Sequence, residues 1–156
     1  MEKHSNQHPH KNKVHKILAH SYLSHAIFLL FGVTLDMIFN LRIFNDSFSV
    51  PLGWMFLLFG TFLVFWAQKT SRNLNKENLS KNTFAKGPYR FTRVPTNLGL
   101  CLLTFGFGLM MNAFFLVLTS LLAFIFIKYT FLHKQEKILA EKYGEPYLEY
   151  KKMVKF

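Results

Sequence analysis

Three long stretches of the chain carry no charged residue, and charged segments separate them. The first two, residues 17–35 and 47–68, hold 19 and 22 residues. A helix needs roughly 20 consecutive, mostly apolar residues to cross a bilayer. The pattern therefore predicts one membrane-spanning helix at about 20–39 and a second at about 49–68.

The third charge-free stretch is longer, with 34 residues at 94–127. At about 1.5 Å of rise per residue it would form a helix of roughly 51 Å, which is too long for a single crossing. Met111-Asn112 lies near its middle, and asparagine is a turn residue. We therefore predict a tight hairpin of two helices, at about 97–111 and 113–131, which brings the number of spans to about four.

The segment after the last predicted span has the pattern of an amphipathic helix. Ile138, Leu139 and Tyr143 fall on one helical stripe. Gly144 is a suitable helix stop, and Pro146 is a suitable restart. The predicted fold is an all-α integral membrane helical bundle of about four transmembrane helices, followed by a cytoplasmic C-terminal amphipathic helix.

Positive charge gathers on one side of the predicted topology. Residues 1–25, 68–93 and 128–156 carry net charges of +3, +6 and +3, whereas the 40–48 connection is neutral. Lysine and arginine favour the cytoplasmic ends of spans. Both termini and the long middle loop are therefore predicted to be cytoplasmic, as an even number of spans requires.

Composition limits the class of protein further. Hydrophobic residues make up 51% and charged residues 17%, and a net charge of +11 accompanies a mean hydropathy of +0.17. The apolar fraction excludes a disordered chain, and the single cysteine, Cys101, excludes a disulfide scaffold. Because the positive charge follows the ends of the spans, we interpret it as a topology signal and expect no nucleic-acid partner.

The N-terminal tail, residues 1–19, precedes the single predicted domain at 20–156 and begins a cluster of histidines. Histidine-rich tracts bind metals or form flexible, weakly cationic tails. The absence of cysteine and the interspersed Gln, Asn and Pro favour the tail, so we expect no metal site. The histidines of the cluster are His4, His8, His10, His15, His20 and His25.

Two features inside the predicted spans each leave two interpretations open. Asp36 lies in an apolar segment, where an ionisable group costs on the order of 3 kcal/mol. It either makes a polar contact inside the bundle or lies near the outer interface, which we favour because the span ends about three residues later. Gly106 and Gly108 allow close approach of another group, usually a neighbouring helix and less often a ligand.

Four motifs follow one another in the second half of the chain. A Gly-Pro turn with two arginines three apart precedes the third span, a G-x-G triplet lies within it, and a glutamate and a tyrosine-rich segment come after the fourth. The motifs are Gly87-Pro88-Tyr89-Arg90-Phe91-Thr92-Arg93 with Pro95 and Gly99, Gly106-Phe107-Gly108, Glu136, and Tyr143-Gly144-Glu145-Pro146-Tyr147-Leu148-Glu149-Tyr150. In this order they resemble the membrane methyltransferases related to isoprenylcysteine carboxyl methyltransferase and phospholipid N-methyltransferase.

The resemblance implies methyl transfer from S-adenosylmethionine, with a cofactor-binding part at 84–156. Arginine binds a carboxylate with a fork of donors, and a glutamate binds an ammonium or a hydroxyl group. For an amine acceptor the implied catalytic base is His133 or Glu136. The implied cofactor-binding residues are Tyr89, Arg90, Arg93, Pro95, Gly99, Gly106, Phe107, Gly108, Gln135, Glu136 and Tyr147.

Three residues depart from the family pattern. Val94 stands where the family usually has histidine, Asn97 where it often has tyrosine, and Gln135 at the first position of an acidic pair. Either the cofactor site is modified or activity is reduced or lost. The alternative to an enzyme is therefore a noncatalytic membrane scaffold of the same fold.

The methyl acceptor stays open. A phospholipid amine, a prenylated cysteine carboxylate and a small thiol are each compatible with the sequence, and a lipophilic acceptor would enter from the bilayer. Methyl transfer is an in-line displacement without a covalent enzyme intermediate. Positioning of the two reactants then contributes most of the catalysis, roughly 7–11 kcal/mol at best.

Overall fold

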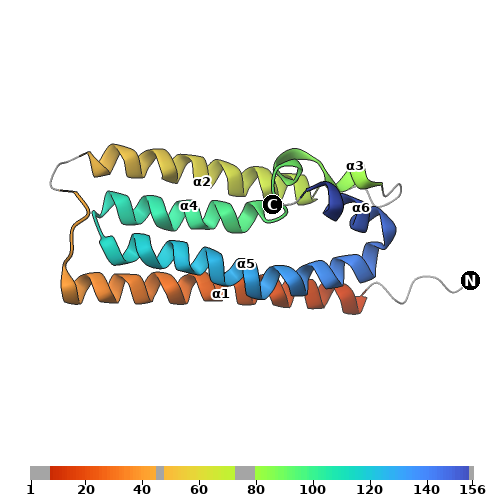
Figure 1. The fold of residues 1–156 in the computed structure, drawn as a ribbon, viewed down its shortest axis with the longest axis horizontal. Helices are drawn as coiled ribbons and strands as arrows, with labels where there is room; N and C mark the ends of the chain where they lie inside the picture. The colour runs from red at the N-terminus through yellow and green to blue at the C-terminus, as the bar shows by residue number, and fades with distance from the viewer. Residues whose placement is uncertain (1–7, 45–47, 73–79, 155–156) are drawn as a thin grey trace, which may run out of the picture.

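The computed structural model describes residues 8–44, 48–72 and 80–154, and over these ranges the chain is a bundle of helices. The four long helices lie side by side in the order α1, α5, α4, α2 (Figure 1). In chain order the helices are α1 (His8–Phe39), α2 (Ser49–Arg72), α3 (Lys81–Phe84), the 3₁₀ helix η1 (Gly87–Arg90), α4 (Pro95–Met110), α5 (Phe114–Tyr143) and α6 (Glu145–Met153).

The helices agree with the spans that the sequence predicts. Three are long and apolar enough to cross a membrane, namely Ala19–Phe39 within α1, Ser49–Arg72 and Phe114–Tyr143, and α4 is a shorter apolar helix. Large apolar side chains point outward along them, since Leu30, Leu58 and Phe65 are 63%, 67% and 67% exposed. Such a surface suits hydrocarbon, so the predicted all-α membrane bundle is confirmed.

The amphipathic segment after the last span is continuous with that span. α5 is a single helix of 30 residues, about 45 Å long, and therefore extends well beyond the hydrocarbon layer. It ends where predicted, because Gly144 follows its last residue with φ 63°. α6 begins at Glu145, with Pro146 in its first turn.

Helices α2 and α4 approach each other closely along a seam of glycines. A Cβ atom added at Gly60 would lie 2.9 Å from the carbonyl oxygen of Gly99, and one added at Gly53 would lie 2.7 Å from that of Gly106. The approach is reciprocal, because Cβ atoms at Gly99 and Gly106 would meet the carbonyl oxygens of Gly60 and Gly53. Close backbone contact of this kind is a common way for membrane helices to associate.

The hairpin turn between α4 and α5 is held against the connection between α1 and α2. Asn112 has φ 56°, the left-handed conformation that asparagine tolerates, which confirms it as a turn residue. Its Oδ1 accepts hydrogen bonds from the backbone amides of Ile43 and Phe44, each at 2.9 Å. Its Nδ2 donates to the carbonyl oxygen of Phe44 at 2.7 Å.

Asp36 makes a polar contact within the bundle rather than merely lying at the interface. Its two carboxylate oxygens accept hydrogen bonds from the backbone amides of Phe115 at 3.0 Å and Leu116 at 2.7 Å. These amides belong to the first turn of α5, where backbone donors have no partner within the helix. A carboxylate from α1 thus caps the positive end of the α5 dipole.

The short elements gather at the opposite end of the bundle. Figure 1 shows α3, η1 and α6 there, beside the last turns of α5 and near the end of α2. The beginning of α1 lies at this end too, whereas the hairpin turn lies at the other. The described parts of the segments with net positive charge therefore lie at one end, which agrees with the predicted topology.

We predict that the glycine seam tolerates no added methyl group. In Gly60→Ala, the Cβ would press on the carbonyl oxygen of Gly99 and on the amide of Leu103, 3.0 Å away. Backbone atoms cannot rotate aside, so we expect a loss of about 1–3 kcal/mol. Thermal unfolding in detergent micelles, followed by far-ultraviolet ellipticity, measures the loss.

The matched control is Thr61→Ala, because this neighbouring side chain is exposed on the outer surface of α2. Its melting temperature should stay close to that of the parent chain. Equal melting temperatures for the two variants would contradict the close packing of α2 against α4 at Gly60.

Candidate functional site

Three segments that are distant in sequence meet at a buried ion network. The Nη1 of Arg93, in the loop before α4, donates to the Oε1 of Glu136 on α5. The Nζ of Lys151 on α6 lies 2.8 Å from the Oε2 of the same carboxylate. Glu136 is only 4% exposed. A buried carboxylate needs such partners, because burying a lone charge costs several kcal/mol.

An aromatic cluster lies beside this network and holds α6 in place. Phe84 of α3 packs against Tyr147 and Tyr150 of α6, with ring centroids 5.6 and 6.0 Å away. The hydroxyl of Tyr150 donates to the carbonyl oxygen of Tyr89 at 2.8 Å. The cluster therefore joins α3, η1 and α6 into one cap over this end of the bundle.

The tyrosines of the cap keep their protons at neutral pH. Burial raises the pKa of Tyr147 and of Tyr150. Burial raises the pKa of Tyr89 too, and its hydrogen bonds with the side chains of Thr96 and Ser71 lower it in part. All three hydroxyl groups therefore stay protonated and neutral, and that of Tyr150 uses its hydrogen in the bond to Tyr89.

Gly144 turns the chain back over the bundle. Its φ of 63° and ψ of −141° lie in a region that is nearly restricted to glycine. This conformation directs α6 towards Tyr89 and Glu136 instead of continuing α5 away from them. The tail after residue 132 therefore returns to the loop that holds Arg93.

The structure brings four of the predicted site residues together: Tyr89, Arg93, Glu136 and Tyr147. Arg90 is exposed on η1, and Pro95 is buried at the start of α4. His133 is exposed and Gln135 is half-buried, both on α5.

Gly106 and Gly108 of α4 lie apart from the ion network. Gly106 is eleven residues along the helix from Pro95, a distance of about 16 Å. Gly99 and Gly106 face α2, and a Cβ at Gly108 would lie 2.9 Å from the Cγ2 of Val117 on α5. Helix packing thus accounts for these three glycines, while Phe107 is 37% exposed. Their role in cofactor binding stays a prediction.

The structure describes only part of the N-terminal histidine cluster. No group of three or more His, Cys, Asp or Glu residues is close enough for a metal ion within the described parts of the chain. His4 lies outside the described residues, and so do the side chains of His8, His10 and His15.

Sequence reasoning missed two members of the site, Lys151 and Tyr150. Tyr147 and Tyr150 are three residues apart and therefore share one face of α6. That spacing was a usable signal for Tyr150. Lys151 is one of several lysines in the tail, and only the fold distinguishes it from the others.

We predict that the docking of α6 weakens in alkali. The unfolded-state pKa of tyrosine is about 10, and the folded chain holds the protons of Tyr147 and Tyr150 more tightly. Their contribution to stability is complete below about pH 10 and falls as the pH rises further. Limited proteolysis should therefore cut α6 faster at about pH 11 than at about pH 9.

The acceleration should persist in Lys151→Gln, which lacks the ion pair of α6, and should be smaller in Tyr150→Phe. A cleavage rate that is flat over this range in the parent chain would contradict the assignment to the tyrosines.

A comparison with protein-family models covers two of the segments that form the ion network. A family model described as phospholipid methyltransferase matches residues 48–146, which is more than half of the chain and includes Arg93 and Glu136. No curated protein and no solved structure matches the chain. The family match confirms the resemblance read from the motifs and fits the helical membrane bundle. The chain therefore belongs to the phospholipid methyltransferase family.

Proposed function

We propose that this protein transfers a methyl group from S-adenosylmethionine to a lipophilic or membrane-accessible acceptor. The observation that carries the proposal is the buried contact of Arg93 with Glu136. It joins the family's loop motif to the part of α5 that extends beyond the last predicted span. The family match supports methyl transfer, and the polar cluster supports a cofactor with several charges.

The residues present fit the chemistry of this cofactor. S-adenosylmethionine carries a carboxylate, an ammonium and a sulfonium, and it supplies the electrophilic methyl group when bound. Arg93 would hold the carboxylate with its fork of donors. Glu136 would hold the ammonium or a ribose hydroxyl. The side chain of Lys151 is 43% exposed, so it is free to leave Glu136 as the cofactor arrives.

The cap would serve catalysis by excluding water. Tyr147 and Tyr150 are 4% and 3% exposed and cover the ion network from the side of α6. Exclusion of water strengthens the electrostatic contacts inside the site. We propose Glu136 or His133, on the same helix, as the group that takes a proton from an amine acceptor.

The direction of the bundle in the membrane forms part of the proposal. The basic end would face the cytoplasm, since lysine and arginine favour that side. The cofactor would enter there, and a lipophilic acceptor would enter sideways from the bilayer. Gln135 is proposed as a further polar contact, and Arg90 would lie at the rim.

A noncatalytic scaffold is the alternative, and one observation favours it. Val94 is 6% exposed, so an apolar side chain fills the position at which the family usually has histidine. A scaffold would keep the bundle and the cap without binding the cofactor.

We predict that calorimetry on the detergent-solubilised chain detects binding of S-adenosylmethionine. Arg93→Gln and Glu136→Gln should each weaken binding at least about tenfold, because each removes a charge-assisted contact. Lys152→Gln is the matched control, since Lys152 is an exposed cation beside the site residue Lys151. The absence of heat at millimolar cofactor would support the scaffold instead.

We also predict that Val94→His raises methyl transfer if the natural valine reflects reduced activity. Histidine restores a donor and an acceptor in a buried position, so an increase of about tenfold is expected. Incorporation of labelled methyl groups into membrane lipid extracts measures it. An unchanged or lower rate would mean that valine belongs to a specialised site.

A further inference from the structure

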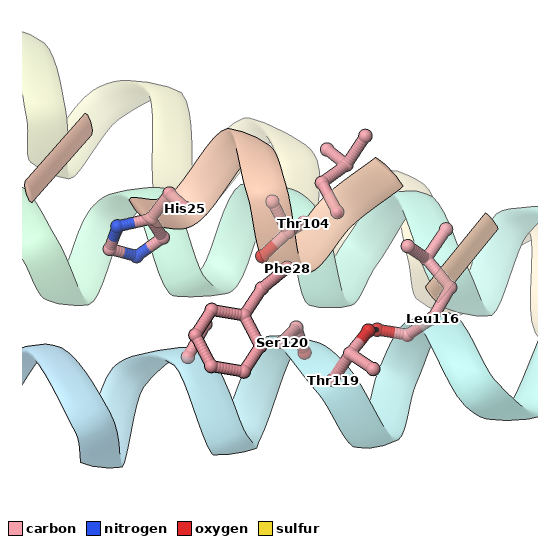
Figure 2. Close-up of a pocket in the computed structure, with 8 residues that line it drawn as sticks. His25, Phe28, Thr104, Leu116, Thr119 and Ser120 are labelled. Carbon is pink, nitrogen blue, oxygen red and sulfur yellow. Dashed lines mark hydrogen bonds between the residues drawn. The ribbon is translucent and has the colours of Figure 1, made fainter. Parts of the chain in front are cut away.

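Glu136 lies on the outer face of α5, away from the centre of the bundle. It follows the fully buried Ile127 by nine residues, which is two and a half turns and therefore the opposite side of the helix. Ser120 points inward as well, to the side on which His25 of α1 and Thr104 of α4 lie (Figure 2). The packing of the long helices against one another therefore does not bury Glu136.

The same outer face of α5 is open nearer the middle of the bundle. Ile125 and Tyr129 precede Glu136 by eleven and seven residues, about three and two turns, so the three side chains share one stripe. Ile125 and Tyr129 are 51% and 72% exposed, whereas Glu136 is buried. The burial of Glu136 therefore comes from the segments that fold over this end of α5, the loop with Arg93 and the helix α6.

Both oxygens of this carboxylate are already paired with cations. Oε1 accepts from Arg93, and Oε2 lies 2.8 Å from the Nζ of Lys151. The cofactor of the proposed function carries an ammonium, the same chemical group as the end of a lysine side chain. A second ammonium at Oε2 would meet the positive charge of Lys151 at close range, so the two groups exclude each other.

Lys151 can release Glu136 while α6 stays in place. Its side chain is 43% exposed, so water can solvate the released ammonium. α6 keeps two other contacts, the hydrogen bond from the hydroxyl of Tyr150 to the carbonyl oxygen of Tyr89 and the packing of Tyr147 on Phe84. The ion pair of Lys151 is therefore the contact of α6 that can break by rotation of one side chain.

We propose that Lys151 is an internal competitor of S-adenosylmethionine, which holds Oε2 of Glu136 and must release it before the ammonium of the cofactor binds there. The inference rests on the proposed function, because it concerns the regulation of the same site. Lys151 keeps the buried carboxylate paired when no cofactor is bound. A site whose competent state is only partly populated binds with a correspondingly higher dissociation constant, so α6 sets the cofactor concentration at which the site fills.

The test is calorimetry on the whole chain in detergent micelles, with the parent chain and Lys151→Met compared. Methionine is unbranched and apolar, and it cannot pair with a carboxylate. We expect the dissociation constant of S-adenosylmethionine to fall about fivefold, the strength of one partly exposed ion pair. A lysine that contacted the cofactor, or that only stabilised the cap, would give the opposite sign when removed. 5′-Methylthioadenosine lacks the ammonium, and its dissociation constant should not fall.

Two further variants and one further measurement separate competition from other effects. Lys152→Met removes the same charge from the neighbouring exposed side chain and should bind like the parent. Lys151→Arg keeps a cation and should bind no more tightly than the parent. Limited proteolysis at neutral pH should leave α6 of Lys151→Met protected, because the contacts of its tyrosines remain.

The outcomes distinguish this inference from the function on which it rests. No binding of S-adenosylmethionine to the parent or to Lys151→Met would overturn the proposed function, and the inference with it. Binding to both, with equal or weaker affinity in Lys151→Met, would overturn the inference alone. An equal gain in Lys152→Met or with 5′-methylthioadenosine would also overturn it, and so would a gain accompanied by rapid cleavage of α6.

Discussion

A buried carboxylate requires cations, and this requirement shapes the basic end of the molecule. Glu136 takes one cation from the loop before α4 and one from α6. The ion pair with Arg93 ties the loop to α5, whereas α6 is held both by its ion pair and by the aromatic cluster. If Glu136 were removed, the two cations Arg93 and Lys151 would repel each other. The ion network beside the cap would then be lost.

The bundle itself is held by different forces. Apolar surface faces outward, so burial from water contributes little between the helices, and close backbone packing becomes more important. The seam between α2 and α4 uses glycines seven residues apart on each helix, so the contact repeats after two turns. At the far end, Asp36 and Asn112 satisfy backbone groups that belong to other elements. Polar side chains thus join the loops, and small residues join the helices.

The sequence predicted the positions of helices and turns better than it predicted which residues contact one another. The charge-free stretches predicted the helices because a bilayer imposes a minimum apolar length, and the hairpin at Asn112 and the stop at Gly144 follow from backbone preferences. These are local properties. Whether Gly106 contacts a helix or a ligand depends on which helix lies opposite it. The capping role of Asp36 depends on a backbone amide about 80 positions later in the chain. Lys151 joins the site only because Gly144 reverses the chain, which sequence spacing does not reveal.

The unequal lengths of α4 and α5 have a consequence for the lipid surroundings. With 16 residues, α4 measures about 24 Å, less than the roughly 30 Å of a typical hydrocarbon layer. The membrane must become thinner beside α4, or the flanking residues must extend towards the head groups. The loop with Arg93 is directly attached to this short helix, whereas Glu136 is carried on the long one. We therefore expect lipids with longer acyl chains to strain the contact between these two residues, which makes bilayer thickness a physical variable of the site.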